Sequence, residues 1–479
     1  MSINTTVVNW MRSPSPFLSE IRNTLQLAVP LGGIQLAEAS IGFINTVMMG
    51  LLGVQSLAAG ALGAITFYTL TLICMGVAEG ASPLAAEAFG ANNLERIPRL
   101  LAQGMWLVVM VSLPMMLLTW NLDSILMLLG QEKNIVALSS TYLRAIVWGF
   151  PAATGFFIMK EIATALNRPQ LISAIALISI PLNITANYLL IFGKLGLPAL
   201  GLAGIGWASV CVFWVNFLAA AAILGFHPWF REYKVFSSLE FDRALFAELW
   251  RNGWPIGLQY ASSLLVFTLI ALISGYMGTT LLAANEIVVQ IIEVSLIVPI
   301  AISYAAITRV GQMFGMNDLN GAKRAGFASI TIGLGAITLV AVALWLFPQQ
   351  IVSIYLDSNE IDHITAIKSA ISLLRVGTFF LMAYGINVIA MGILMGIQDT
   401  RLPLLINIGF EWGIGIISGY LLCFHLNMGS IGLWLGLTLG VTLATVFLIY
   451  SFYRSISEMI QSSEDEQGLK ETPILNSIS

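Results

Sequence analysis

Charge is scarce in this sequence. Only 10% of its 479 residues are Asp, Glu, Lys or Arg, whereas 58% are hydrophobic and the mean hydropathy is +0.87. Soluble domains carry about 25% charged residues, so this composition excludes a water-soluble enzyme or binding protein. The apolar runs are about twenty residues long, which matches the ~20 residues that a helix needs to cross ~30 Å of hydrocarbon. The sequence therefore predicts a membrane protein.

Cysteine and histidine are also rare, with three of each. Cys74, Cys211 and Cys423 fall in separate apolar runs, which predicts reduced packing residues and no disulfide or metal site. The histidines lie in loops or at span ends, and neither a His-Glu-x-x-His motif nor paired aspartates occur, which argues against an intramembrane enzyme. No filter-like segment of a channel is present. We expect no enzymatic activity, no cofactor and no nucleic-acid partner.

Gly, Pro, Asn and charge clusters divide the chain into twelve apolar spans. The expected fold class is an all-α polytopic membrane protein with twelve transmembrane helices, embedded in the lipid bilayer. Because twelve is even, both termini lie on one side. The expected spans are 24–50, 56–80, 98–120, 138–166, 171–192, 201–225, 249–276, 282–306, 323–347, 370–396, 402–424 and 429–453.

Basic residues predict the orientation of these spans. Fifteen of the 21 Lys and Arg residues fall on the side of the termini, five on the opposite side, and Lys160 lies within a span. The positive-inside rule then places both termini in the cytoplasm. The first residues are polar, so we expect no cleavable signal peptide. This pattern suits the plasma (inner) membrane of a bacterium.

The longest and most charged inner loop separates six spans from six. It predicts a cytoplasmic N-terminal segment, an N-lobe of six helices, a cytoplasmic linker, a C-lobe of six helices and a disordered cytoplasmic tail. Their expected bounds are 1–22, 23–226, 227–248, 249–454 and 455–479.

The two halves are copies of one another. At a constant offset of 225 residues, proline and glycine recur in pairs: Pro30 with Pro255, Gly32 with Gly257, Gly50 with Gly275 and Gly53 with Gly278. Further along the offset drifts, and Arg144 matches Arg375. Since each half has an even number of spans, the copies share one orientation, an arrangement typical of transporters. We predict two pseudo-symmetric six-helix lobes.

Several motifs in this order resemble the multidrug and toxic compound extrusion (MATE) family. They include PLGGIQLAEASIGFINTVMMG in the first span, FGANNLERIPR after the second, RVGQMFGMNDLNGAKR after the eighth and MGILMGIQDTRLP closing the tenth. The resemblance runs from about residue 22 to 455. It implies a secondary antiporter that exports organic, often cationic and amphipathic compounds in exchange for sodium ions or protons. It also implies two lobes around a cleft that opens alternately to each side, and a working monomer.

An acid within the first span is the first candidate for function. Glu38 lies about thirteen residues into the span, roughly 20 Å along a helix. A charge there costs about 2.5–3.5 kcal/mol on insertion scales, so it is expected to face a bundle interior or a watery cavity. Asn45 follows two turns later on the same face, and Asn183 and Asn187 are expected to join it in one polar cluster. The alternative for Glu38 is a structural acid, either protonated or ion-paired.

A second polar stripe lies on the eighth span. Glu286, Gln290 and Glu293 fall at positions i, i+4 and i+7, which places them on one helix face. Glu411 lies near mid-depth of the eleventh span. All are candidates for cation coupling or substrate binding, the alternative being hydrogen bonds that hold helices together.

Three further charged residues are ambiguous. Lys160 and Glu161 are adjacent near the inner end of the fourth span, where a charged pair often only snorkels to the interface. We therefore treat this pair as a weaker candidate. Glu79 is expected to lie at the inner interface.

The chain departs from the family at three positions where relatives carry carboxylates. Asn45 occupies one of them, and the others fall at or near Ser263 and near Tyr384, which are weaker site candidates. Glu38 is the repeat mate of Ser263. Our hypothesis is that Glu38 replaces the missing acid of the N-lobe and binds the proton or the sodium ion. Sodium needs several oxygens, which Glu38, Asn45, Asn183 and Asn187 would supply in part. The alternative function is a lipid or lipid-linked precursor flippase of the same wider superfamily.

Overall fold

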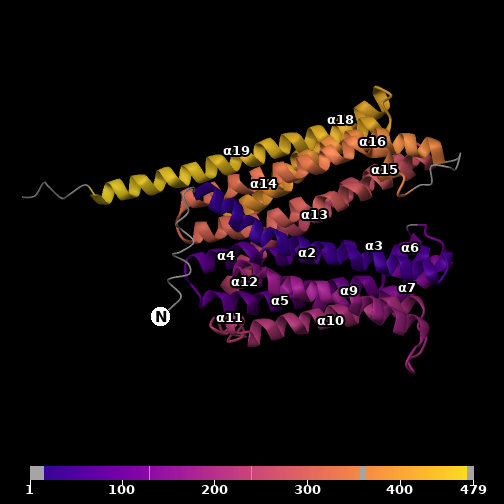
Figure 1. Cartoon of the computed structure of the whole chain (residues 1–479), viewed down its shortest axis with the longest axis horizontal. Coiled ribbons are helices and arrows are strands. Elements are labelled where there is room, and N and C mark those ends of the chain that lie inside the picture. Colours follow the sequence, from indigo (N-terminus) through magenta and orange to yellow (C-terminus); the bar gives the residue numbers. More distant parts are fainter. Residues whose placement is uncertain (1–15, 129, 239, 356–362, 472–479) are drawn as a thin grey trace, which may run out of the picture. The chain divides into compact units, whose positions relative to one another are not determined.

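A computed structural model of the chain describes residues 16–128, 130–238, 240–355 and 363–471. These residues form helices joined by turns and short loops, with no strand in the described ranges. Twelve helices are long and apolar enough to cross a membrane. The predicted all-α fold class with twelve spans is therefore confirmed (Figure 1).

The chain forms two compact units. Unit 2 comprises Gln26–Ile273 and Thr400–Leu404. In Figure 1 its long helices lie side by side, in indigo to magenta. Its helices are α2 (Pro16–Leu51, from Gln26 on), α3 (Val54–Glu79), α4 (Ala81–Gly90), α5 (Arg96–Trp120), α6 (Leu122–Leu128), α7 (Lys133–Ile146), a 3-10 turn (Val147–Gly149), α8 (Phe150–Ala165), α9 (Pro169–Phe192), α10 (Leu202–Phe226), α11 (Pro228–Arg231) and α12 (Arg243–Tyr276).

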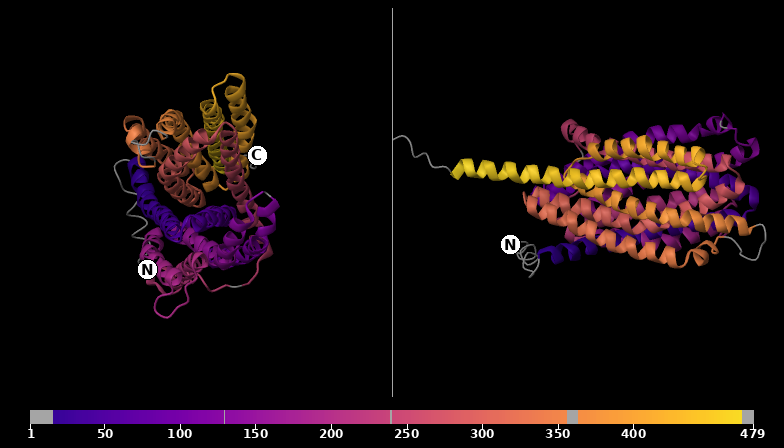
Figure 2. Two further views of the ribbon diagram at one scale, coloured as in Figure 1. Left: turned by 90° about the vertical axis from the view of Figure 1, so that its right-hand side faces the viewer. Right: turned by 90° about the horizontal axis from the view of Figure 1, so that it is seen from above.

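Unit 1 comprises Met1–Leu25, Ser274–Asp399 and Leu405–Ser479. Figure 2 shows its long helices side by side, with α19 running past the ends of its neighbours. Besides the start of α2, its helices are α13 (Thr279–Gly315), α14 (Leu319–Leu346), α15 (Pro348–Val352), α16 (His363–Gly396), α17 (Arg401–Phe410, from Leu405 on), a π-helix (Glu411–Ile416), α18 (Ile417–Tyr420), a second π-helix (Leu421–His425) and α19 (Ser430–Glu471).

The helices are longer than the apolar runs that predicted them. α2 begins at Pro16, where we expected residue 24, and α13 continues to Gly315, beyond the expected residue 306. α19 continues to Glu471 through the segment that we expected to be a disordered tail; residues 472–479 lie outside the described part. The hydrocarbon thickness limits the apolar run only, and polar residues at its ends continue the backbone hydrogen bonds.

The boundaries of the two compact units differ from those of the predicted lobes. The lobes were placed on either side of the linker 227–248, whereas unit 2 extends through α12 to Ile273 and the first turns of α2 belong to unit 1. Each half of the repeat thus has a first helix that packs, in part, outside its own half.

The duplication is visible in the backbone. Asn92 and Asn317, 225 positions apart, have φ angles of 55° and 57°. Asn167 and Gln398, 231 positions apart, have φ angles of 60° and 64°. Non-glycine residues seldom adopt this left-handed conformation. Matched pairs of them support the repeat that the sequence predicts.

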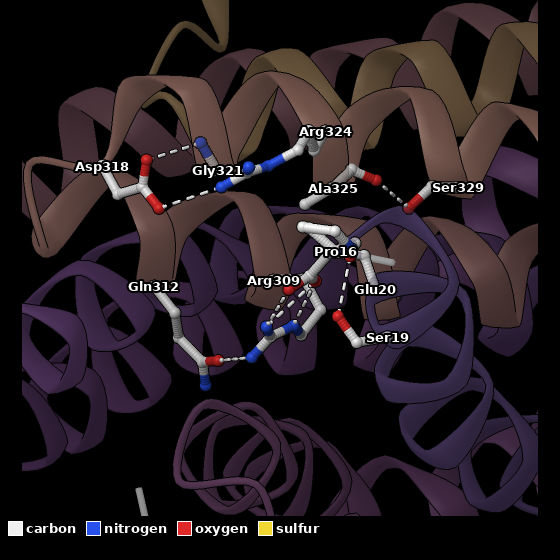
Figure 3. Close-up of polar contacts among 10 residues, drawn as sticks. All are labelled: Pro16, Ser19, Glu20, Arg309, Gln312, Asp318, Gly321, Arg324, Ala325 and Ser329. Atoms are coloured by element: carbon white, nitrogen blue, oxygen red, sulfur yellow. Dashed lines mark hydrogen bonds and ion pairs between the residues drawn. The ribbon is translucent and has the colours of Figure 1, made fainter. Parts of the chain in front are cut away.

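The start of α2 is held in unit 1 by a buried ion pair (Figure 3). The guanidinium of Arg309, on α13, donates to both carboxylate oxygens of Glu20 at 2.9 Å, and to Gln312 Oε1 at 2.8 Å. Glu20 and Arg309 are 7% and 9% exposed. A bidentate pair of this kind fixes the position as well as the charge of both groups.

Candidate functional site

Three asparagines of unit 2 meet in one cluster. The side-chain amide of Asn187, on α9, donates to Asn45 Oδ1 of α2 at 2.8 Å and to Asn183 Oδ1 at 3.0 Å. Asn45 Nδ2 in turn donates to Ser209 Oγ of α10 at 3.3 Å. Asn183 and Asn187 are fully buried. The predicted polar cluster is therefore present and joins three helices.

The amide cluster keeps unused hydrogen-bonding capacity. Asn183 Nδ2 and Asn187 Oδ1 are buried and have no hydrogen-bond partner among the described residues. Such atoms are costly in an apolar interior unless a bound ion or water satisfies them. The oxygens of Asn45, Asn183 and Asn187 are donors of the kind that sodium takes, but the cluster contains no carboxylate.

Lys160 and Glu161 are buried within unit 2. They are 3% and 1% exposed, and Lys160 Nζ lies 3.0 Å from Glu161 Oε1 and 3.7 Å from the centroid of the Phe157 ring. The expectation that this pair snorkels to the interface is wrong. Sequence position near the end of a span gave no sign that other helices cover α8 on every side.

Glu79 is likewise buried, at 3% exposure, and is not the interfacial residue that we expected. The hydroxyl of Tyr260, on α12, donates to Glu79 Oε2 at 2.7 Å. Both Lys160 and Glu161 are close enough to Glu79 for their charges to act on it. Glu79 was missed because it lies at the predicted inner end of its span, and its partner is 181 residues away in the sequence.

Glycines bring α12 close enough to α3 for the contact between Tyr260 and Glu79. A Cβ atom on Gly80 would lie 2.6 Å from Gly253 Cα, and one on Gly76 would lie 2.8 Å from Gly257 Cα. Both helices thus carry a Gly-x-x-x-Gly pair at their contact, the pattern that lets membrane helices approach most closely. These two Gly-x-x-x-Gly motifs are visible in the sequence and are the pattern that could have indicated this helix contact.

Glu38 is exposed, although it lies at mid-span on α2. Its charge is within reach of that of Lys160. In the described part of the chain Glu38 makes no hydrogen bond to Asn45, Asn183 or Asn187. Glu38 and Asn45 lie seven residues apart on α2, about 10 Å along the helix, so the acid makes no direct contact with the amide cluster through this helix face.

The second polar stripe occupies one face of α13, in unit 1. Glu286, Gln290 and Glu293 are all exposed, whereas the opposite face, including Ile287, Val288 and Ile291, is buried. Glu286 and Glu293 are close enough for their charges to interact.

Glu411 opens the π-helical segment Glu411–Ile416 of unit 1 and is 3% exposed. Its Oε1 has no hydrogen-bond partner among the described residues. Short π-helical segments occur frequently at functional sites. Glu411 remains a candidate with no charged neighbour in the described contacts.

The two other departures from the family pattern fall in different units. Ser263 accepts a hydrogen bond from Gln259 at 3.3 Å in unit 2. Tyr384, in unit 1, stacks on Phe380 with ring centroids 5.3 Å apart. Neither contact by itself indicates a role in binding.

No group of three or more His, Cys, Asp or Glu side chains is arranged to hold a metal ion within the described ranges. The three cysteines are free, and Cys211 is exposed instead of packed.

The chain is similar to proteins of known family along most of its length. The MatE family model matches residues 30–189 and 255–421, one segment in each half of the repeat. The probable multidrug resistance protein NorM of Synechocystis sp. is 36% identical over 438 residues, which cover 91% of this chain and 95% of the relative. The protein of that name in Pseudomonas syringae pv. tomato is 34% identical, with coverage of 91% and 95%.

Solved structures show the same fold. The crystal structure of MATE in complex with MaL6 matches with a TM-score of 0.84 at 19% identity, covering 95% of this chain and 99% of that chain. An outward-facing multidrug resistance MATE family transporter of the MOP superfamily matches with a TM-score of 0.83 at 18% identity, covering 92% and 96%. Because the family model matches more than half of the sequence and relatives above 30% identity cover most of it, this chain belongs to the MATE family.

Proposed function

We propose that this chain is a secondary active transporter of the plasma (inner) membrane that exports organic, cationic and amphipathic compounds in exchange for protons or sodium ions, by alternating access. One observation carries the proposal beyond family membership. Glu38, Glu286 and Glu293 are exposed side chains on membrane-spanning helices. Carboxylates at such depth avoid lipid and line watery pathways, and their negative charge attracts cations.

The two polar stripes take different roles in this proposal. Glu38, whose charge is within reach of that of Lys160, binds the coupling ion. The stripe Glu286, Gln290 and Glu293 binds the positively charged part of the substrate, with Glu411 as a further candidate in unit 1. Exchange requires that ion and substrate exclude one another, as two cations attracted by the same negative charges do.

The proton is favoured over sodium as the coupling ion. Sodium binding by protein oxygens is strongest where a carboxylate joins the ligand set, but the amide cluster of Asn45, Asn183 and Asn187 has none in the described contacts. A lone carboxyl group such as Glu38 takes up and releases a proton without other ligands. We expect a monomer that needs no cofactor.

Transport of a fluorescent organic cation into everted vesicles, which corresponds to efflux from the cell, driven by either a proton or a sodium gradient, tests the proposal. We expect the proton gradient to drive efflux in the wild type, and Glu38→Gln to reduce that efflux at least tenfold. Glu458→Gln, which changes an exposed carboxylate paired with Arg454 on α19, is the control and should transport normally.

The outcomes are distinct. Full gradient-driven efflux in Glu38→Gln would reject the role of Glu38 and direct attention to Glu286, Glu293 and Glu411. A response to sodium alone would assign the ion to the amide cluster. Translocation of labelled lipid in proteoliposomes, without efflux of any organic cation, would reject the exporter in favour of a flippase.

A further inference from the structure

Unit 2 contains a buried group of ionisable side chains that the proposed exchange at Glu38 does not use. It consists of Glu79 on α3, Lys160 and Glu161 on α8, and Tyr260 on α12. The first three are at most 3% exposed. We call these four residues the buried charge group.

The buried charge group has more acids than bases. The charged or titratable neighbours acting on Glu79 are Glu161, Tyr260 and Lys160, and the one acting on Glu38 is Lys160. Two buried carboxyl groups therefore face one ammonium group. If both were ionised, one negative charge would stay uncompensated in a low-dielectric interior, which is strongly unfavourable.

A second observation indicates that a bound proton supplies the positive charge that the buried charge group lacks. Neither carboxylate oxygen of Glu161 has a hydrogen-bond partner among the described residues, although the side chain is 1% exposed. The 3.0 Å approach of Lys160 Nζ qualifies as an ion pair but lacks the geometry of a hydrogen bond. A buried carboxylate normally collects several donors, whereas a protonated acid needs fewer.

We propose that Glu79 and Glu161 together hold one exchangeable proton, which keeps the buried charge group neutral opposite Lys160. The hydroxyl of Tyr260 favours the ionised form of Glu79, and the ammonium group of Lys160 favours the ionised form of Glu161. The proton is therefore shared, and it resides on the acid whose interaction with its partner is weaker. Its source and destination are water, and no bond other than O–H forms or breaks.

The three charged residues of the buried charge group, Glu79, Lys160 and Glu161, all lie in the first half of the repeat. At the offsets fixed by the matched backbone pairs, the mates of its three charged residues are uncharged: Tyr304 for Glu79, Met391 for Lys160 and Gly392 for Glu161. The second half of the repeat folds without a charge at any of these positions, so the shared fold does not require one. The excess acid is therefore an addition to the fold.

Lys160 connects this proton to Glu38. When Glu38 loses its ion, it becomes a second negative charge facing Lys160, and the buried pair gains from taking up a proton. This link rests on the proposed function, because it assumes that Glu38 carries the coupling ion. The proton shared by Glu79 and Glu161 does not depend on that assumption.

The proton is measured directly by the infrared C=O stretch of protonated carboxyl groups in the purified protein at neutral pH. We expect Glu79→Gln and Glu161→Gln each to lose one carboxyl equivalent of this absorption, because the remaining acid pairs with Lys160. We expect Lys160→Met to gain at least one equivalent. The double variant Lys160→Met with Glu161→Gln should match the wild type, and so should the surface control Glu458→Gln.

Unchanged absorption in Glu79→Gln and Glu161→Gln would overturn the proposal, since both acids would then be ionised in the wild type. Glu79→Gln removes no positive charge, so it keeps the test decisive if Lys160→Met fails to fold. Efflux separates this inference from the proposed function. Loss of efflux in Glu38→Gln with no infrared change in the Glu79 and Glu161 variants would reject the buried proton only. The infrared changes without gradient-driven efflux in the wild type would reject the antiporter only.

Discussion

The side-chain amide of Asn187 connects two helices of unit 2, α9 and α2. Asn187 donates to both Asn45 and Asn183, so its loss leaves one half-buried and one buried acceptor without this donor. The sequence placed Asn183 and Asn187 one turn apart on one helix, which allowed the cluster to be predicted. The contact with Ser209 on α10 was not predicted, because helical spacing says nothing about which neighbouring helix comes within 3.3 Å.

Asn187→Leu should destabilise the protein by about 1–2 kcal/mol, because hydrogen bonds inside membrane proteins contribute up to ~1.7 kcal/mol and orphaned acceptors add a further cost. The thermal unfolding midpoint in detergent measures this. Asn121→Ala is the matched control: its amide is exposed and bonds only to Leu117 O. An equal midpoint for Asn187→Leu and wild type would show that the cluster contributes no stability.

At the scale of helices, close glycine contacts and one ion pair fix how the elements pack. α3 and α12 meet through Gly76, Gly80, Gly253 and Gly257, which bring Tyr260 to Glu79. The start of α2 is fixed to α13 through Glu20 and Arg309. Both contacts join segments more than 170 residues apart, so neither follows from local pattern.

Gly80→Ala should lower stability by about 1–3 kcal/mol, the usual cost of forcing an extra methyl group into a filled contact. Backbone atoms of Gly253 are the obstacle, and they cannot rotate away. Gly335→Ala on α14 should act in the opposite direction, raising stability by roughly 0.5–1 kcal/mol, because a Cβ there meets nothing within 4 Å and alanine favours helix. If both changes shifted the unfolding midpoint alike, the glycine contact would not be tight.

Glu20→Gln should destabilise the protein by about 3–5 kcal/mol, because it leaves the buried guanidinium of Arg309 without its counter-charge. Removing both charges, as Glu20→Gln with Arg309→Met, should recover most of that loss. The exposed pair Arg454–Glu458 is the comparison, where Glu458→Gln should change stability by no more than about 0.5 kcal/mol. A double variant no more stable than Glu20→Gln would contradict an electrostatic origin.

At the scale of the whole chain, the direction of insertion is the main open prediction. Loop charges place the termini and the linker in the cytoplasm. In a variant without native cysteines, Ser237→Cys should react with a membrane-impermeant thiol reagent in everted vesicles but not in intact cells. Lys194→Cys should show the reverse. Both positions are exposed, so failure to react cannot be due to burial, and the opposite labelling pattern would invert the topology.

The sequence alone determined the number of spans, the duplication and the family. These depend on properties that act locally or repeat regularly: the length of apolar runs against the thickness of a bilayer, and matched Pro, Gly and Asn at fixed offsets. It also located Glu38 and the stripe on α13, because a charge in an apolar run is visible without a structure.

Only the tertiary structure decided which of these side chains meet. It buried Lys160 and Glu161 where an interfacial pair was expected, and it brought Tyr260 to Glu79. It also separated Glu38 from the asparagine cluster. The reason is physical: burial and pairing depend on which helices pack around a residue, and contacts across hundreds of residues leave no trace in the periodicity of either helix.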